Sequence, residues 1–349
     1  MQTSVWPIDP DHPDASVIAR AAAVVRRGGL VAFPTETVYG LGADATSPAA
    51  VEQIYVAKGR DRDDPLIVHI ATIQELERVA TGVSPLTRAL AETFWPGPLT
   101  VIARRHAGLA EAVGGGRETV AVRMPSHPVA LALIQAAGVP IAAPSANRFM
   151  HTSPTAAKHV LDDLDGAIDL VLDGGPVTVG IESTVVAVEG NEVRILRPGG
   201  VSAEELAAAV ALLDADATVV EASGTQASAS PGTLSRHYAP GIPLTLITGP
   251  GRLAVAAAEY VAAAPPSDGL ALCAPDSASD AIRGVVAVER LGPEDAPAVH
   301  AQRLYAALRA LEGCGANRIL AVYFADGGLG RAVLDRLRRA AAEVIEVQG

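Results

Sequence analysis

The chain has 349 residues and a formal net charge of −12, because 39 acidic residues outnumber 27 lysines and arginines. That balance argues against nucleic acid as the main ligand, since phosphate backbones are bound by cationic surfaces. Hydrophobic residues make up 49% of the chain but aromatic residues only 3%, which predicts aliphatic, alanine-rich cores. At roughly 100–200 residues per domain, the length indicates two domains.

The chain lacks the features of exported or membrane-spanning proteins. Its first residues are acidic and have no basic start or apolar run of a signal peptide, and no apolar stretch approaches the roughly 18 residues that a membrane span requires. Cys273 and Cys314 lie far apart with no C-x-x-C partner. That usage is typical of a reducing compartment and argues against a disulfide framework or a cysteine-based zinc site. We therefore expect a soluble cytoplasmic protein.

Short apolar runs alternate with helical patterns through the first two hundred residues, which predicts an α/β domain with buried strands. The apolar runs cover 30–33, 66–70, 99–105, 119–125 and 139–144. Expected helix starts are Ser47-Pro48, Ser153-Pro154 and the capping pattern Ser202-x-x-Glu205. On the helix after Ser47, Lys58 continues the apolar face and should emerge at the helix C-terminus.

The pattern changes near Asp214. Residues 221–233 are rich in Gly, Ser and Ala without a hydrophobic period, which indicates a linker. Apolar runs at 244–248, 270–274, 285–291 and 319–325 then alternate with helical segments at 252–263, 294–312 and 329–343. We therefore predict a catalytic domain over 1–213, a linker over 214–242 and a smaller Rossmann-like parallel α/β domain over 243–349. The one glycine-rich turn after a strand there, at 249–251, lacks the spacing of a nucleotide-binding loop.

Three clusters of polar residues follow the predicted strands of the first domain. The first, PTETVYGLGAD at 34–44, combines hydroxyls, carboxylates and glycines; a threonine-rich turn would look the same. In the second, Lys58, Arg60 and Arg62 lie within five residues, which suits a phosphate but also describes a solvated charge run. Only two of the 27 basic residues are lysines, Lys58 and Lys158, and this scarcity favours a function for Lys58.

The third cluster consists of single polar residues on or after separate strands. Each alone could be a surface charge or a helix cap, and His69 within LIVHI could be an ordinary core histidine. Together the cations indicate a pocket for a polyanion and a small carboxylate. No Ser-His-Asp, G-x-S-x-G or H-E-x-x-H pattern is present. The members of the third cluster are Thr119, Arg123, Ser145, Asn147, Ser183, Thr184 and Arg197.

Residues 15–213 closely resemble the YrdC family, and the whole chain resembles its longer, two-domain form. The resemblance rests on the K-x-R…S-x-N pair, Lys58-Gly-Arg60 and Ser145-Ala-Asn147. It also rests on FPTETVYGLG, PLIVHI, FWPGPLT, VRMPSHP, APSAN, IESTVV and LRPGG in the family's order, and on SPGTLSRHYAP at 230–240. It implies a twisted mixed sheet with helices and a concave cleft.

The activity that this resemblance implies is synthesis of threonylcarbamoyl-AMP from L-threonine, bicarbonate and ATP, with release of pyrophosphate. Mg²⁺ is expected on the ATP phosphates. The product would pass to tRNA threonylcarbamoyl-transferase proteins that modify an adenosine beside the anticodon, so tRNA itself would bind only weakly or indirectly.

The resemblance also implies roles for individual residues. L-Threonine would be held by Thr37, His69, Arg123, Ser183 and the Ala143 backbone, with Arg123 on its carboxylate. The nucleotide and carbonate region would be lined by Lys58, Arg60, Thr119, Ser145, Asn147, Ser153 and Arg197, with Lys58 and Arg60 as the catalytic pair. Tyr238 in the linker would reach over the same cleft. Asp64 stands where the family usually has Asn, so its contact with the nucleotide is in doubt.

Two other functions fit parts of the sequence. One is an RNA-binding module without turnover, which the net charge and the low aromatic content oppose as the main role. The other is carbamoyl-adenylate transfer to a different acceptor, which belongs to larger fusions carrying zinc-finger cysteines.

Overall fold

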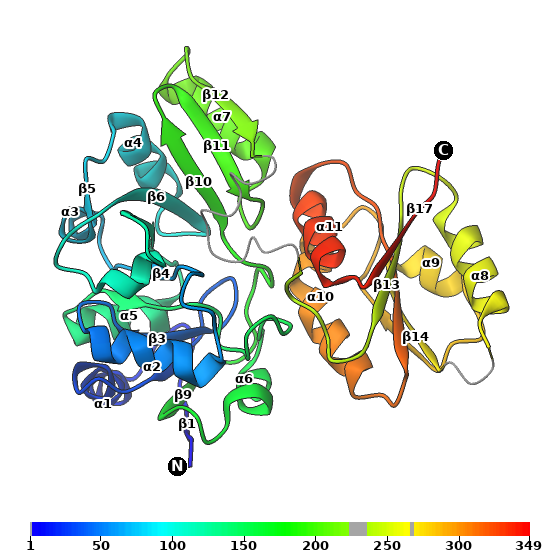
Figure 1. Ribbon diagram of the computed structural model, residues 1–349, viewed down its shortest axis with the longest axis horizontal. Helices are drawn as coiled ribbons and strands as arrows, with labels where there is room; N and C mark the ends of the chain where they lie inside the picture. Colours follow the sequence, from blue (N-terminus) through cyan, green and yellow to red (C-terminus); the bar gives the residue numbers. More distant parts are fainter. Residues whose placement is uncertain (1, 223–235, 266–268) are drawn as a thin grey trace. The chain divides into compact units, whose positions relative to one another are not determined.

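A computed structural model describes residues 2–222, 236–265 and 269–349 (Figure 1). The chain forms two compact units: Met1–Phe149 with Ser153–Thr233, and Met150–Thr152 with Leu234–Gly349. Much of the predicted linker, residues 223–235, lies outside the described residues.

The first unit is built on one large mixed sheet, as predicted. Its strands follow the order β1-β9-β2-β3-β8-β4-β7-β6-β10-β11-β12, with β5 beside β6. The central strands β4 and β7 run parallel, whereas β6 and β7 run antiparallel. The strands are β1 (Ser4–Pro7), β2 (Val31–Phe33), β3 (Gly40–Asp44), β4 (Ile67–His69), β5 (Ala80–Thr81), β6 (Leu99–Arg105), β7 (Thr119–Arg123), β8 (Ile141–Ala142), β9 (Leu170–Asp173), β10 (Thr184–Glu189), β11 (Glu192–Arg197) and β12 (Thr218–Glu221).

Helices cover this sheet and bury its aliphatic residues. The helices are α1 (Ala15–Arg26), α2 (Pro48–Lys58), α3 (Leu76–Val79), α4 (Pro85–Phe94), α5 (Pro128–Ala137), α6 (Ala157–Leu164) and α7 (Ala203–Leu213). Helices α1 and α5 pack together, and their core includes Val25 and Leu133. The short 3-10 helices are Ile73–Glu75 and Glu111–Gly114.

Two of the three predicted helix starts are confirmed and one is wrong. Ser47 caps α2, and Gly59 ends it in the left-handed conformation at φ 61°, so Lys58 is its last residue. Ser202 and Glu205 form the predicted capping box of α7. The prediction of a helix start at Ser153 is wrong: α6 begins at Ala157. The Ser153 hydroxyl donates to the buried Glu182 Oε1 at 2.6 Å. This contact is distant in sequence, and the N-cap of α6 is Ala156.

The second unit is a five-stranded parallel sheet in the order β15-β14-β16-β13-β17, as the alternating pattern predicts (Figure 1). Its strands are β13 (Leu244–Thr248), β14 (Leu270–Ala274), β15 (Ala287–Arg290), β16 (Arg318–Val322) and β17 (Glu343–Glu346). Its helices are α8 (Leu253–Ala263), α9 (Asp276–Ala281), α10 (Pro297–Glu312) and α11 (Gly328–Ala340).

The unit boundaries differ from the predicted domain boundaries in two places. Strand β12, within the predicted linker 214–242, pairs with β11 and so extends the first sheet. Residues 150–152, within the predicted first domain, belong to the second unit. There Met150 O accepts a bond from Ala239 N at 2.9 Å, and His151 Nε2 lies 3.1 Å from Glu312 Oε2. Strand β12 and residues 150–152 are both too short to show a hydrophobic periodicity that could be detected in the sequence.

Gly199, in the LRPGG segment after β11, has no space for a side chain. A Cβ atom there would lie 2.3 Å from the Glu182 carbonyl oxygen and 2.5 Å from Thr184 N, both backbone atoms. We predict that Gly199→Ala lowers the free energy of unfolding of the first unit by about 1–3 kcal/mol. Urea unfolding followed by tryptophan fluorescence measures this, because the two tryptophans, Trp6 and Trp95, both lie in that unit.

Gly108→Ala is the matched control. Gly108 is exposed, and a Cβ there would meet only the His106 imidazole, a side chain that can move. Its effect should stay within about 0.5 kcal/mol. Equal stability of the two variants would contradict the close-packing argument for Gly199.

Candidate functional site

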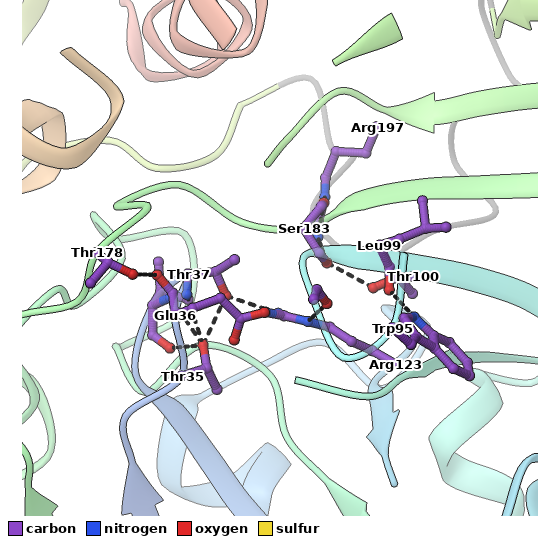
Figure 2. Close-up of polar contacts among 12 residues, drawn as sticks. Thr35, Glu36, Thr37, Trp95, Leu99, Thr100, Arg123, Thr178, Ser183 and Arg197 are labelled. Atoms are coloured by element: carbon purple, nitrogen blue, oxygen red, sulfur yellow. Dashed lines mark hydrogen bonds and ion pairs between the residues drawn. The ribbon is translucent and has the colours of Figure 1, made fainter. Parts of the chain in front are cut away.

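The buried guanidinium of Arg123 is the centre of the candidate site (Figure 2). Its Nη1 donates to Thr37 Oγ1 at 2.8 Å and its Nε donates to the Gly97 carbonyl at 3.2 Å. Its Nη2 forms an ion pair with Glu36 Oε1 at 2.7 Å. Arg123 ends β7, where the parallel register with β4 places it opposite His69. The ends of β4 and β7 therefore gather three sequence-predicted residues, Thr37, His69 and Arg123, together with Glu36.

Two loops, formed by two of the sequence motifs, supply these contacts. In PTETVYGLG, the Thr35 hydroxyl donates to the Val38 carbonyl at 2.6 Å and lies 2.8 Å from Thr37 Oγ1, which fixes the turn. In FWPGPLT, Trp95 Nε1 donates to the Leu99 carbonyl at 2.7 Å. These bonds hold the two loops beside the Arg123 guanidinium.

Ser183 joins the site from the loop before β10. Its Oγ lies 2.7 Å from Thr100 Oγ1 on β6, the strand paired with both β7 and β10 (Figure 2). Arg197 Nη2 donates to the Ser183 carbonyl at 2.9 Å and to Ser183 Oγ at 3.2 Å. The sequence-predicted residues Ser183 and Arg197 therefore hold each other in place, and Thr100 was not foreseen.

His69 is a neutral polar group in this site. Burial, reinforced by the positive charge of Arg123, lowers the pKa of His69 to about 3. Its Nδ1 is buried and has no hydrogen-bond partner among the described residues. A buried ring nitrogen without a partner is costly, so Nδ1 is an atom that a polar ligand could use.

Lys58 brings the two halves of the K-x-R…S-x-N pair together. Its Nζ donates to the Ser145 carbonyl at 2.6 Å and to the Asn147 carbonyl at 2.5 Å, and Phe149 N donates to the Lys58 carbonyl at 2.9 Å. Burial, and then the neighbouring charge of Arg60, lowers the pKa of Lys58 well below its usual value. An anion placed here would favour the charged form of Lys58.

Arg60 is buried and already paired. Its Nη2 lies 2.9 Å from Asp64 Oδ2 and donates to the Pro65 carbonyl at 2.8 Å. The Asp64 carboxylate is therefore directed at Arg60. An asparagine at this position could not balance that charge.

The other predicted residues lie in different surroundings. Ala143 is buried directly after β8, and Thr119 is half-buried at the end of β7 opposite to Arg123. Tyr238 lies in the second unit, where its buried ring packs 4.0 Å from the His237 ring and 5.0 Å from the Arg336 guanidinium carbon. The residues that sequence reasoning missed, Glu36, Gly97, Thr100 and Glu182, all lie inside motifs it quoted.

Comparisons with known proteins agree with this architecture. The Sua5–YciO–YrdC family model, described as telomere recombination, matches residues 23–199. The model of the threonylcarbamoyl-AMP synthase C-terminal domain matches residues 201–342. The threonylcarbamoyl-AMP synthase of Bacillus subtilis is 40% identical over 98% of each chain, and that of Pyrococcus abyssi is 41% identical over 92% of each. The crystal structure of P. abyssi Sua5 complexed with L-threonine superposes with a TM-score of 0.88 at 36% identity, covering 99% of this chain and all of that one.

The fold and the buried cationic site define a YrdC-type α/β enzyme with an appended Sua5-type domain. The chain belongs to the threonylcarbamoyl-AMP synthase family, whose members are enzymes of the nucleotidyltransferase type. No helix among the described residues is long and apolar enough to cross a membrane.

His69 makes the stability of the first unit depend on pH. Its pKa is about 3 in the folded protein and about 6.5 in an unfolded chain. Between pH 6.5 and pH 3 the His69 imidazole is therefore protonated in the unfolded chain but neutral in the folded protein. The contribution of His69 to the free energy of unfolding is fully present above pH 6.5. Below pH 6.5 it falls by about 1.4 kcal/mol per pH unit. We predict that the wild-type protein loses about 2 kcal/mol more than His69→Asn between pH 6.5 and pH 5.

Urea unfolding at each pH, followed by tryptophan fluorescence, tests this. His12→Asn is the control, because His12 is exposed and its removal should not alter the pH dependence. Parallel curves for the wild type and His69→Asn would contradict a neutral, buried His69.

Proposed function

We propose that this protein forms L-threonylcarbamoyladenylate from L-threonine, bicarbonate and ATP, with release of pyrophosphate. The product serves the N6-threonylcarbamoyladenosine modification of tRNA next to the anticodon. The observation that carries the proposal is the buried Arg123, ringed by Thr37 and Glu36 and opposite neutral His69. The threonine complex of the homologous P. abyssi protein supports it.

Arg123 retains capacity for the threonine carboxylate. A guanidinium has five N–H donors, and the described protein contacts are one each from Nε, Nη1 and Nη2. A second hydrogen on Nη1 and on Nη2 therefore remains for a forked carboxylate contact. In this assignment Thr37, His69, Ser183 and the Ala143 backbone complete the L-threonine site.

Lys58 and Arg60 are assigned to the ATP phosphates. Threonine's amine and bicarbonate form an N-carboxylate with loss of water, and its oxygen attacks the α-phosphorus in line with departing pyrophosphate. Lys58 and Arg60 stabilise the charge that develops on the phosphate oxygens. The remaining nucleotide-region assignments are Asp64, Thr119, Ser145, Asn147, Ser153, Arg197 and Tyr238.

Mg²⁺ enters this proposal with ATP. The described residues contain no group of three or more His, Cys, Asp or Glu side chains that could hold a metal, so the phosphate oxygens themselves would supply its ligands. The proposed recipients of the product are tRNA threonylcarbamoyl-transferase proteins. The proposed location is the cytoplasm, which the free thiols of Cys273 and Cys314 support.

One assay tests the reaction. The protein is incubated with ATP, bicarbonate and Mg²⁺ and with each amino acid in turn, and pyrophosphate is measured. We expect release with L-threonine that depends on bicarbonate, together with a product of the mass of threonylcarbamoyl-AMP. Equal release without bicarbonate would refute the proposal, and salt-dependent tRNA binding without turnover would favour the RNA-binding alternative.

The assignment of Lys58 and Arg60 to the ATP phosphates is tested by alanine substitutions, with another lysine as the control. Lys58→Ala and Arg60→Ala should each lower pyrophosphate release about 10²–10³-fold, the usual effect of removing one preorganised donor. Lys158→Ala is the control, because Lys158 is exposed on α6 and pairs only with Asp162 there at 2.8 Å. It should retain wild-type activity. Near-normal turnover in both test variants would overturn the assignment.

A further inference from the structure

Glu36 is a buried carboxylate that the assigned threonine contacts do not use. The residue is 6% exposed, and neither carboxylate oxygen accepts a hydrogen bond of good geometry among the described residues. Its one described ion pair is with Arg123 Nη2 at 2.7 Å (Figure 2). The Glu36 carbonyl accepts a bond from Val179 N at 2.7 Å, so the backbone that carries the side chain is fixed.

A carboxylate in this state is costly. Taking it out of water costs several kcal/mol unless it is paired and its oxygens accept hydrogen bonds. Arg123 offsets part of that cost through its charge and the 2.7 Å contact of its Nη2 with Oε1, yet neither oxygen accepts a hydrogen bond of good geometry among the described residues. The carboxylate therefore lacks a donor that the described protein does not supply.

The polar atoms around Arg123 whose hydrogen bonds are incomplete form one group. They are both oxygens of Glu36, Nδ1 of His69 and Nη2 of Arg123: none makes a hydrogen bond of good geometry among the described residues, and Nη2 and Glu36 Oε1 contact each other as an ion pair. Arg123 links the other two, by the ion pair with Glu36 and by its position opposite His69. Unsatisfied buried groups that cluster in this way indicate a polar ligand.

Space exists beside Glu36. A cavity of about 530 Å³ borders this residue on the side of Ser126, His127 and Thr178, and its lining does not include Arg123 or His69. Burial lowers the pKa of His127, so this histidine is a poor source of positive charge for the carboxylate at neutral pH. Arg123 is then the cation against which Glu36 is balanced.

The adjacent Arg123 and Glu36 match the two charges of an α-amino acid. An amino-acid substrate carries a carboxylate and an ammonium on the same carbon, and burial of the ammonium without an acceptor would cost free energy. The threonine assignment gives Arg123 to the carboxylate but names no anionic partner for the ammonium. We propose that the Glu36 carboxylate accepts hydrogen bonds from the α-ammonium group of the amino-acid substrate. This inference rests on the proposed function in taking that substrate to be L-threonine.

Two ligands separate direct contact from an effect through Arg123. L-Threonine has the ammonium, whereas 3-hydroxybutyrate keeps the carboxylate and the hydroxyl but has no amine. Binding of each to the wild type and to Glu36→Gln is measured by calorimetry. We expect Glu36→Gln to weaken threonine binding about 10–100-fold and to leave 3-hydroxybutyrate binding unchanged within about threefold. In turnover, KM for threonine should rise while KM for ATP stays constant.

Two results would overturn the proposal. An equal loss of affinity for both ligands means that Glu36 acts only by orienting Arg123, and an unchanged threonine affinity means that it makes no contact. The tryptophan fluorescence of each variant checks that the first unit is folded. If Glu36→Gln does not fold, Glu36→Asp replaces it: the shortened carboxylate should again weaken threonine binding more than 3-hydroxybutyrate binding.

Failure of the proposed function gives a different result. If the wild-type protein binds another amino acid instead of threonine, the proposed substrate is wrong, and Glu36 is judged with that amino acid and its des-amino analogue. If no amino acid binds, both the proposed function and the role of Glu36 are refuted.

Discussion

The burial of the Arg123 guanidinium is the constraint on which the candidate site depends. A buried charge is stable only when it is paired and its donors are used. Two segments remote in sequence meet this demand: the turn after β2 supplies Thr37 and Glu36, and the loop after α4 supplies the Gly97 carbonyl. Because these segments are far apart in the chain, the sheet must bring both of them to Arg123 before its guanidinium can be buried.

The neighbouring strands extend this arrangement outward. Strand β4 places neutral His69 opposite Arg123, and strand β6 places Thr100 against Ser183, which is held in turn by Arg197. The lowered pKa of His69 has the same origin as the pairing of Arg123, since burial beside a cation opposes a second positive charge. The site therefore combines a cation, the Glu36 carboxylate and neutral donors and acceptors, a set suited to recognising a small zwitterion.

Much of this could be predicted from the sequence. The alternation of apolar runs and helical patterns predicted both sheets, and the motifs singled out Lys58 and Arg123, which the structure buries. Glu36 and Thr100 lie inside those motifs, yet a single sequence cannot say which of several polar side chains in a turn points inward. Ser153 shows a second limit: its local pattern is that of a helix cap, but the structure uses its hydroxyl to donate to Glu182, a carboxylate distant in sequence. The inclusion of residues 150–152 in the second unit likewise depends on contacts that no local pattern records.

Two of the cations assigned to substrates share a further property, because each is paired with a carboxylate of the protein. Glu36 lies against Arg123, and Asp64 lies against Arg60. Such pairs let buried arginines exist before any ligand is bound, since an unpaired guanidinium would otherwise oppose folding. They also set a condition on substrate binding: an incoming anion must share the arginine with its resident carboxylate rather than neutralise a bare charge. A ligand that brings its own positive charge meets that condition at Arg123, because its ammonium can pair with Glu36 while its carboxylate takes the free donors. At Arg60 the proposed ligand is the polyanionic triphosphate of ATP, whose charge would favour the protonated form of the nearby Lys58, the form that burial disfavours.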